Sequence, residues 1–109
     1  MKAIEALLGV APGLVGAARA DVGGNVYEVA GPVDGESLCA VAAMARVPLE
    51  RSSEILGLGG LRDWSFAYAQ GALYVHQGDE LVAVQGSATK SPETVMKRLG
   101  QALGDGRTS

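Results

Sequence analysis

The sequence predicts a small α+β sandwich, in which antiparallel strands carry helices on both faces. The 109 residues are 48% hydrophobic and 19% charged, which is enough apolar surface for one core. Apolar residues recur at helical spacing in some stretches and alternate at strand spacing in others. The predicted order is helix, two strands, helix, three strands, helix. We expect one domain over residues 1–104 and a flexible tail over residues 105–109.

Composition argues against several classes of protein. The 9 basic and 12 acidic residues give a net charge of −3, and the basic residues are scattered. No basic stripe is present to neutralise phosphates, so we expect no nucleic-acid partner. The single Cys and single His cannot build a disulfide framework or a closed zinc site. No apolar run reaches the ~18 residues of a membrane span, so we expect no membrane association.

The first 20 residues allow two interpretations. Lys2, an apolar stretch and Ala18-Arg19-Ala20 resemble a secretory signal with its cleavage site. Pro12-Gly13 breaks the apolar stretch in its middle, which a signal tolerates poorly. We therefore favour a short helix with an apolar stripe, a Pro-Gly corner and a buried strand over residues 14–20.

A hairpin and a long helix follow. The turn at residues 21–25 contains adjacent glycines and leads into a strand over residues 26–30. Asp34 is suited to cap the next helix. Pro48 lies inside the helical pattern, and the sequence leaves open whether the helix kinks or splits there. The apolar positions predicted to mark the buried side of this helix are Leu38, Val41, Ala42, Ala45, Leu49, Ile55 and Leu56.

The second half of the chain predicts a three-stranded meander and a final helix. Residues 61–70 alternate, with Trp64, Phe66 and Tyr68 on one face. Tight turns at Gly71 and at Gly78-Asp79 separate the next two strands. Ser91 is the expected N-cap of the last helix, and Gly104 its expected end. The residues predicted to line that helix are Val95, Met96, Leu99 and Leu103.

The aromatic strand over residues 61–70 predicts self-association. It contains no lysine, and as an edge strand it would be an aggregation site if it stayed unpaired. Each of its three aromatic side chains can bury roughly 150 to 250 Å², in part under the chain's own helix. The unpaired backbone edge still calls for a partner, and a symmetric dimer supplies one.

The chain resembles the roadblock/LC7 family over residues 2–103. The resemblance rests on Leu7-Leu8, on the Ala-Pro-Gly-Leu-Val-Gly-Ala-Ala run of residues 11–18, and on Asp21 and Gly24 in the hairpin. The long helix, its glycine-rich exit and the Leu-Val-Ala-Val strand of residues 81–84 also match. The Pro-Gly corner is the most specific of these features.

This resemblance implies a fold and a role. Members fold as a five-stranded antiparallel sheet, form homo- or heterodimers, and serve as platforms for Ras-like GTPases or motor complexes. In bacteria the better-known members regulate a polarity or motility GTPase. Pro48 departs from the uninterrupted helix of that family. The implied dimer interface, through the third strand and the long helix, comprises Val41, Met44, Ala45, Trp64, Phe66 and Tyr68.

Charged residues on the long helix are the candidate partner-binding site. Arg46 and Glu50 are four residues apart, and Arg51 and Glu54 three apart, on the predicted solvent side. A mixed-sign surface suits specific docking of a GTPase. A plain solvated helix face explains the same residues equally well.

No residue pattern predicts catalysis, a cofactor or a metal site, and we expect a non-catalytic protein of the bacterial cytoplasm. His76 has no identifiable nucleophile nearby, and Cys39 has no cation close in sequence to activate it. Residues 57–60 lack the Lys-Ser or Lys-Thr of a phosphate loop. The alternative function is a structural or small-molecule-sensing scaffold, whose pocket would draw on Tyr74, His76 and Gln85.

Overall fold

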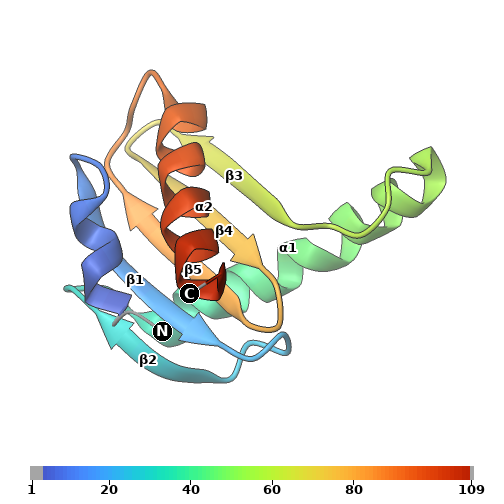
Figure 1. The fold of residues 1–109 in the computed structure, drawn as a ribbon, viewed down its shortest axis with the longest axis horizontal. Coiled ribbons are helices and arrows are strands. Elements are labelled where there is room, and N and C mark those ends of the chain that lie inside the picture. Colours follow the sequence, from blue (N-terminus) through green and yellow to red (C-terminus); the bar gives the residue numbers. More distant parts are fainter. Residues whose placement is uncertain (1–3, 109) are drawn as a thin grey trace.

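The computed structural model describes residues 4–108, so Lys2 of the possible signal and Ser109 of the predicted tail lie outside the described residues. The elements follow the predicted order (Figure 1). They are η1 (Ile4–Gly9), β1 (Leu14–Ala20), β2 (Val26–Ala30), α1 (Gly35–Leu56), β3 (Asp63–Tyr68), β4 (Gly71–Gln77), β5 (Leu81–Gly86) and α2 (Pro92–Thr108).

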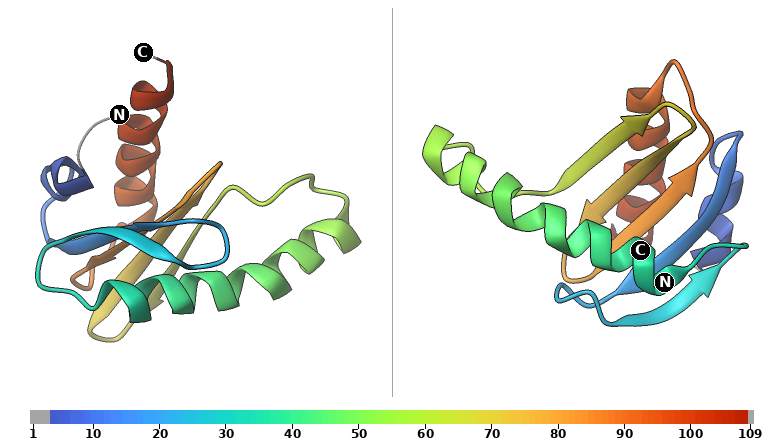
Figure 2. Two further views of the ribbon diagram at one scale, coloured as in Figure 1. Left: turned by 90° about the horizontal axis from the view of Figure 1, so that it is seen from below. Right: turned by 180° about the vertical axis from the view of Figure 1, so that it is seen from behind.

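The strands form one five-stranded antiparallel sheet in the order β2-β1-β5-β4-β3. Strand β5 is therefore central, and β2 and β3 are the two edges. Helix α1 lies on one face of the sheet, and η1 and α2 lie on the other (Figure 2). This arrangement confirms the predicted α+β sandwich.

Each face of the sheet carries its own apolar core. The alternation of side chains along the strands divides β4 and β5 between the two cores: Leu73 and Leu81 face α1, whereas Tyr74 and Val84 face η1 and α2. Strand β1 contributes alanines to both faces, and these small side chains allow helices to approach closely. The core beneath α1 comprises Ala18, Ala20, Leu38, Cys39, Ala42, Trp64, Leu73, Val75, Leu81 and Ala83.

The N-terminal segment folds as the favoured interpretation predicts. Ile4 and Leu7 of η1 are buried, and residues 14–20 form the strand β1. The first helix differs in type, because η1 is a 3₁₀-helix rather than an α-helix. Six residues are too few for a stable α-helix, and the tighter 3₁₀ form is common in short connecting pieces.

Helix α1 is continuous through Pro48, which answers the question that the sequence left open. Asp34 caps its start as predicted, accepting a hydrogen bond from the Ser37 backbone N–H at 3.2 Å. Gly57 ends it with φ of 66°, a left-handed conformation that favours glycine. Pro48 leaves the Met44 carbonyl without its usual helical donor, and it lies on the exposed side of the helix, where water can reach that carbonyl.

The predicted buried side of α1 is only half right. Leu38 and Ala42 are buried, and Ala45 and Leu49 are partly buried. Val41, Ile55 and Leu56 are exposed, which corrects the prediction. For the last turn of α1 the reason is visible in Figure 2: the C-terminal part of the helix extends beyond the sheet, so no core lies beneath it. Val41 lies in the first half of the helix and lines a cleft there.

Two further boundaries differ from the prediction. The third strand is shorter than residues 61–70, because Asp63–Tyr68 alone pair with β4. Helix α2 continues past Gly104 to Thr108, where the sequence predicted a flexible tail. A single glycine lowers helix stability by only about 1 kcal/mol, so it does not have to end a helix. Val95 and Leu99 are buried and Met96 and Leu103 partly buried, as predicted.

Gly31 offers a sharp test of the corner after β2. Its φ is +83°, and a Cβ there would lie 2.4 Å from the Val15 carbonyl oxygen. We expect Gly31→Ala to lower the free energy of unfolding by about 3 kcal/mol, from backbone strain and overpacking together. Gly100→Ala is the control: nothing lies within 4 Å of its Cβ, and the helix should gain about 0.5–1 kcal/mol. Urea unfolding of both variants gives their free energies of unfolding. Equal changes in the two variants would contradict the strain and overpacking expected at residue 31.

Candidate functional site

The first candidate functional surface is the end of α1. Residues 51–60, which we call the arm, are exposed except for Ser53, and they project beyond the sheet (Figure 1). Ile55 is 75% exposed, and Leu56 and Leu58 are exposed to a similar degree. Nearer the sheet, Met44 is also 75% exposed. Several large apolar side chains exposed on one helix are typical of an interaction surface.

A cleft of about 340 Å³ lies beside the first half of α1. One wall is the helix, with Leu38 and Val41, and the other is the β3–β4 hairpin, with Tyr68 and Leu73. Asp34, Ser37 and Gln85 supply polar groups at this site. Its mostly apolar character makes the cleft suitable for an apolar side chain or a small ligand.

The two edge strands of the sheet differ in the features that prevent an edge from pairing with a further strand. Strand β2 contacts η1 and carries Glu28, and its pairing with β1 contains a register shift between Arg19 and Ala20. Strand β3 pairs with β4 without any register shift, contains no lysine or proline, and carries one charged residue, Asp63, at its first position, where it contacts His76 of β4. Bulges and charged side chains are the usual devices that stop an edge from pairing. Strand β3 is therefore the edge open to a further strand.

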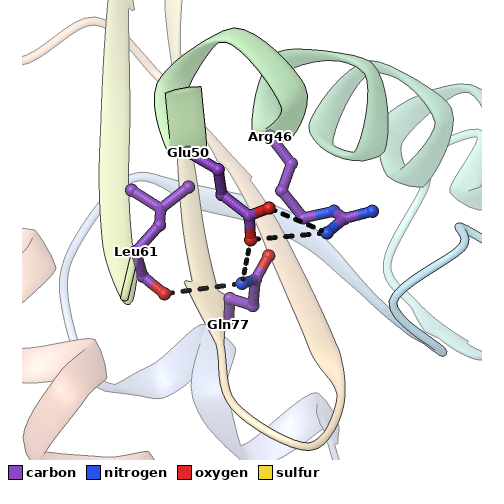
Figure 3. Close-up of polar contacts among 4 residues, drawn as sticks. All are labelled: Arg46, Glu50, Leu61 and Gln77. Atoms are coloured by element: carbon purple, nitrogen blue, oxygen red, sulfur yellow. Dashed lines mark hydrogen bonds and ion pairs between the residues drawn. The ribbon is translucent and has the colours of Figure 1, made fainter. Parts of the chain in front are cut away.

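The arm is held by a polar network at the end of the sheet (Figure 3). The Glu50 carboxylate accepts from the Arg46 guanidinium at 3.3 Å and from the Gln77 amide at 3.1 Å. The same Gln77 amide donates to the Leu61 carbonyl at 3.4 Å. Four residues from α1, β4 and the segment before β3 are thereby joined. Nearby, the Ser53 hydroxyl donates to the Gly59 carbonyl within the arm.

This network corrects the predicted solvent-side charge surface. The Arg46 side chain is only 28% exposed, and Glu50 turns toward the sheet rather than away from it. Arg51 and Glu54 are exposed as predicted, but no ion pair joins them in the part of the chain that the structure describes. Two of the four charged residues are therefore exposed, and the other two join the helix to the end of the sheet.

The six predicted dimer-interface residues fall into two groups. Val41, Met44 and Tyr68 are exposed, and Ala45 is partly buried on the same helix. Trp64 is only 8% exposed and packs in the core beneath α1, with Phe66 partly buried against the same core. The aromatic face of β3 is thus largely covered by the chain itself, and the open part of this strand is its backbone edge.

Structural comparison matches this architecture to one group of proteins. The roadblock/LC7 domain from Streptomyces avermitilis superposes with a TM-score of 0.79 at 16% identity, covering 98% of this chain and 97% of that one. The chain has the roadblock/LC7 fold.

Two further solved structures are similar to this chain. The gliding protein MglB from Thermus thermophilus gives a TM-score of 0.75 at 16% identity, covering 91% of this chain and 78% of that one. An MglB with a tetrameric arrangement gives 0.74 at 18% identity, covering 92% and 81%. No family model matches the sequence. No curated protein matches it either.

The histidine and cysteine take structural places in this roadblock/LC7 fold. His76 is buried, and its Nδ1 lies 2.5 Å from a carboxylate oxygen of Asp63, its cross-strand neighbour on β3. Cys39 is fully buried, and burial raises the pKa of its thiol to about 11, so the reactive thiolate is scarce at neutral pH.

The structure does not bring together the residues of the predicted sensing pocket. Tyr74 and His76 face α2, where the space beside them is only about 10 Å³. Gln85 lies on the opposite face of the sheet, in the cleft beside α1. Among residues 4–108 no group of His, Cys, Asp and Glu side chains could hold a metal ion. Within the same residues, no helix is long and apolar enough to cross a bilayer.

Sequence reasoning missed Gln77 and the cleft. Gln77 is 27 residues from Glu50 along the chain, and nothing in the local pattern distinguishes it from a solvent-exposed strand end. The cleft draws on residues from Asp34 to Gln85, so only the folded sheet assembles it. Ser37, in its wall, was visible only as a neighbour of the Asp34 cap.

The anchoring role of Glu50 can be measured. We expect Glu50→Ala to lower the free energy of unfolding by about 1 kcal/mol, since a partly exposed carboxylate loses two donors. Amide hydrogen exchange in the arm should quicken at the same time. Glu54→Ala, on the same helix but away from the network, should change stability by less than about 0.5 kcal/mol. Equal exchange in the two variants would show that the network does not hold the arm.

Proposed function

We propose that the protein is a non-catalytic dimeric adaptor of the bacterial cytoplasm, which binds a small Ras-like GTPase and modulates its nucleotide state or location. The observation that carries the proposal is that one chain with the roadblock/LC7 fold has both an exposed apolar helix end and an open sheet edge. The partner class rests on the resemblance of the sequence to the roadblock/LC7 family.

Two features support a dimer. The β3 edge offers unpaired backbone groups, and pairing with the same edge of a second copy would extend the sheet. The exposed Val41 of α1 lines a cleft together with Tyr68 of β3, so apolar surface of the helix would be buried by the same event. Self-association is a property that this fold can carry, since one similar MglB has a tetrameric arrangement.

We assign partner binding to the exposed charged side chains of the arm. Arg51 and Glu54 are exposed, with Arg46 and Glu50 held behind them in the anchoring network. Charges at the rim of an interface steer association and select the partner. An adaptor of this kind would act by ordering the switch loops of the GTPase, because an ordered segment can complete a catalytic site.

A scaffold that senses a small molecule is the second candidate. The cleft beside α1 favours it, with Ser37, Tyr68 and Gln85 as polar groups in an otherwise apolar site. A ligand there would bind without any GTPase. Retention of ligand by the purified protein, with no GTPase bound in either nucleotide state, would favour this alternative.

Dimerisation is tested by light scattering at micromolar concentration. We expect a dimer for the natural chain and a monomer for Met44→Asp, since a carboxylate buried without a partner should weaken association at least about 100-fold. Met44 is exposed in one chain, so the variant should still fold. Val22→Asp, at an exposed apolar position in the β1–β2 turn, should remain dimeric. A strictly monomeric natural chain would contradict the dimer.

GTPase binding is tested with purified Ras-like GTPases of the source organism, each loaded with GDP or a non-hydrolysable GTP analogue. We expect one of them to bind in one nucleotide state. Reversing both charges, Arg51→Glu with Glu54→Arg, should weaken that binding about tenfold while the protein stays dimeric. Unchanged affinity would place the docking surface elsewhere, and no binding by any GTPase would contradict the adaptor function.

A further inference from the structure

We infer that a pocket at the arm, between the last turns of α1 and the segment that follows, holds an arginine side chain of the partner protein. The class of partner, a Ras-like GTPase, is taken from the proposed function, on which this inference rests. The pocket shares no residue with the cleft beside the first half of α1, so it is a separate surface.

The pocket has a volume of about 270 Å³. Glu50 and Glu54 line it from the helix, and Gly57, Gly59 and Gly60 line it from the segment after the helix. Nothing lies within 4 Å of a Cβ built at any of these three glycines. A lining of glycine leaves the backbone bare, so a side chain of another molecule can approach it closely. The space exceeds the roughly 30 Å³ of one water several times, which gives room for a long side chain.

The last turn of α1 contains an acid where a helix favours a base. The carbonyl dipoles make the C-terminal end of a helix negative, so a cationic side chain is stabilising there. The last turn of α1 has no basic residue, and Glu54 lies in it. Among the residues that the structure describes, none forms an ion pair with Glu54. A cation in the pocket would therefore meet both this carboxylate and the negative end of the helix.

Three charged residues follow one another on α1 at a spacing of four, and the last of them has no opposite charge. Arg46 pairs with Glu50 at 3.3 Å. Glu50 and Glu54 are also four residues apart, and like charges at that spacing destabilise a helix. A cation bound beside both carboxylates would remove this repulsion. The chain supplies the cation at the start of the series, and we assign the cation at its end to the partner.

An arginine side chain fits the remaining features of the pocket. Its planar guanidinium can donate two parallel hydrogen bonds to one carboxylate and further bonds to helix carbonyls. Its methylene groups can pack against Leu61, the apolar residue of the lining. Ile55 and Leu58 adjoin the lining residues in sequence and are 75% and 72% exposed. They would cover apolar neighbours of the arginine, which favours a protein segment over a free cation.

Two blocked dipeptides test the recognition of arginine. Nuclear magnetic resonance follows the backbone amides of the whole chain during titration with N-acetyl-Leu-Arg-amide. We expect the amides of residues 53–61 to shift, with a Kd on the order of 1–10 mM for so small a ligand. The citrulline analogue of this peptide has nearly the same shape without the charge, and it should bind at least about fivefold more weakly.

A matched pair of variants tests the carboxylate. Glu54→Gln removes the charge with little change of size, and it should weaken binding of the arginine peptide at least about fivefold. Glu36→Gln is the control: Glu36 is an exposed acid in the first turn of the same helix, outside the pocket. This variant has the same change in net charge and should keep its affinity within about twofold. Both side chains are exposed, so both variants should fold.

The outcomes separate the pocket from the proposed partner. Equal weakening by Glu54→Gln and Glu36→Gln overturns the pocket, because it would indicate general attraction to an acidic chain. Equal binding of the two dipeptides, or no shift at residues 53–61, overturns it as well. A GTPase that binds the chain but is unaffected by Glu54→Gln overturns the pocket and leaves the adaptor function standing. Arginine binding at the arm without binding of any GTPase supports the pocket and contradicts the partner class alone.

Discussion

The length of α1 relative to the sheet is the constraint on which the functional surface depends. A helix of 22 residues is about 33 Å long, whereas five strands span only about 19 Å from first to last. One end of α1 therefore packs on β1, β2 and β5, and the other end has no sheet to cover. The exposed arm follows from this excess length, and its anchoring network lies where the helix leaves the sheet.

Because the arm has no sheet beneath it, hydrogen bonds at its base fix its position instead of apolar burial. The Glu50 carboxylate does this by accepting from both Arg46 and Gln77, which lie on different elements. A surface ion pair alone contributes little to stability, but the contact with Gln77 connects the helix to the end of β4. Two of the four charged residues predicted to bind a partner are therefore structural, and the exposed surface of α1 is more apolar than the sequence indicated.

The roadblock/LC7 fold could be predicted from the sequence to a large extent, because its local signals are consistent. Three of these signals are the Pro-Gly corner, the Asp34 cap and the alternation through Trp64. Each depends only on residues close together in the chain, and the structure has the element that each predicts. The failures occurred where burial depends on distant elements. Ile55 has the same apolar character as Leu38, and only the end of the sheet makes one exposed and the other buried. Gly104 similarly read as a helix end, although α2 continues past it.

The sequence by itself determined the order of the elements, the faces of the strands and the absence of a recognisable catalytic motif, because these follow from periodicity, turn residues and composition. The tertiary structure alone decided which apolar residues remain outside and which charges are held. It also decided where Asp63 meets His76 and where the cleft opens. Such contacts join residues far apart in the chain, and their energies depend on how α1 crosses the sheet. No local pattern encodes that crossing.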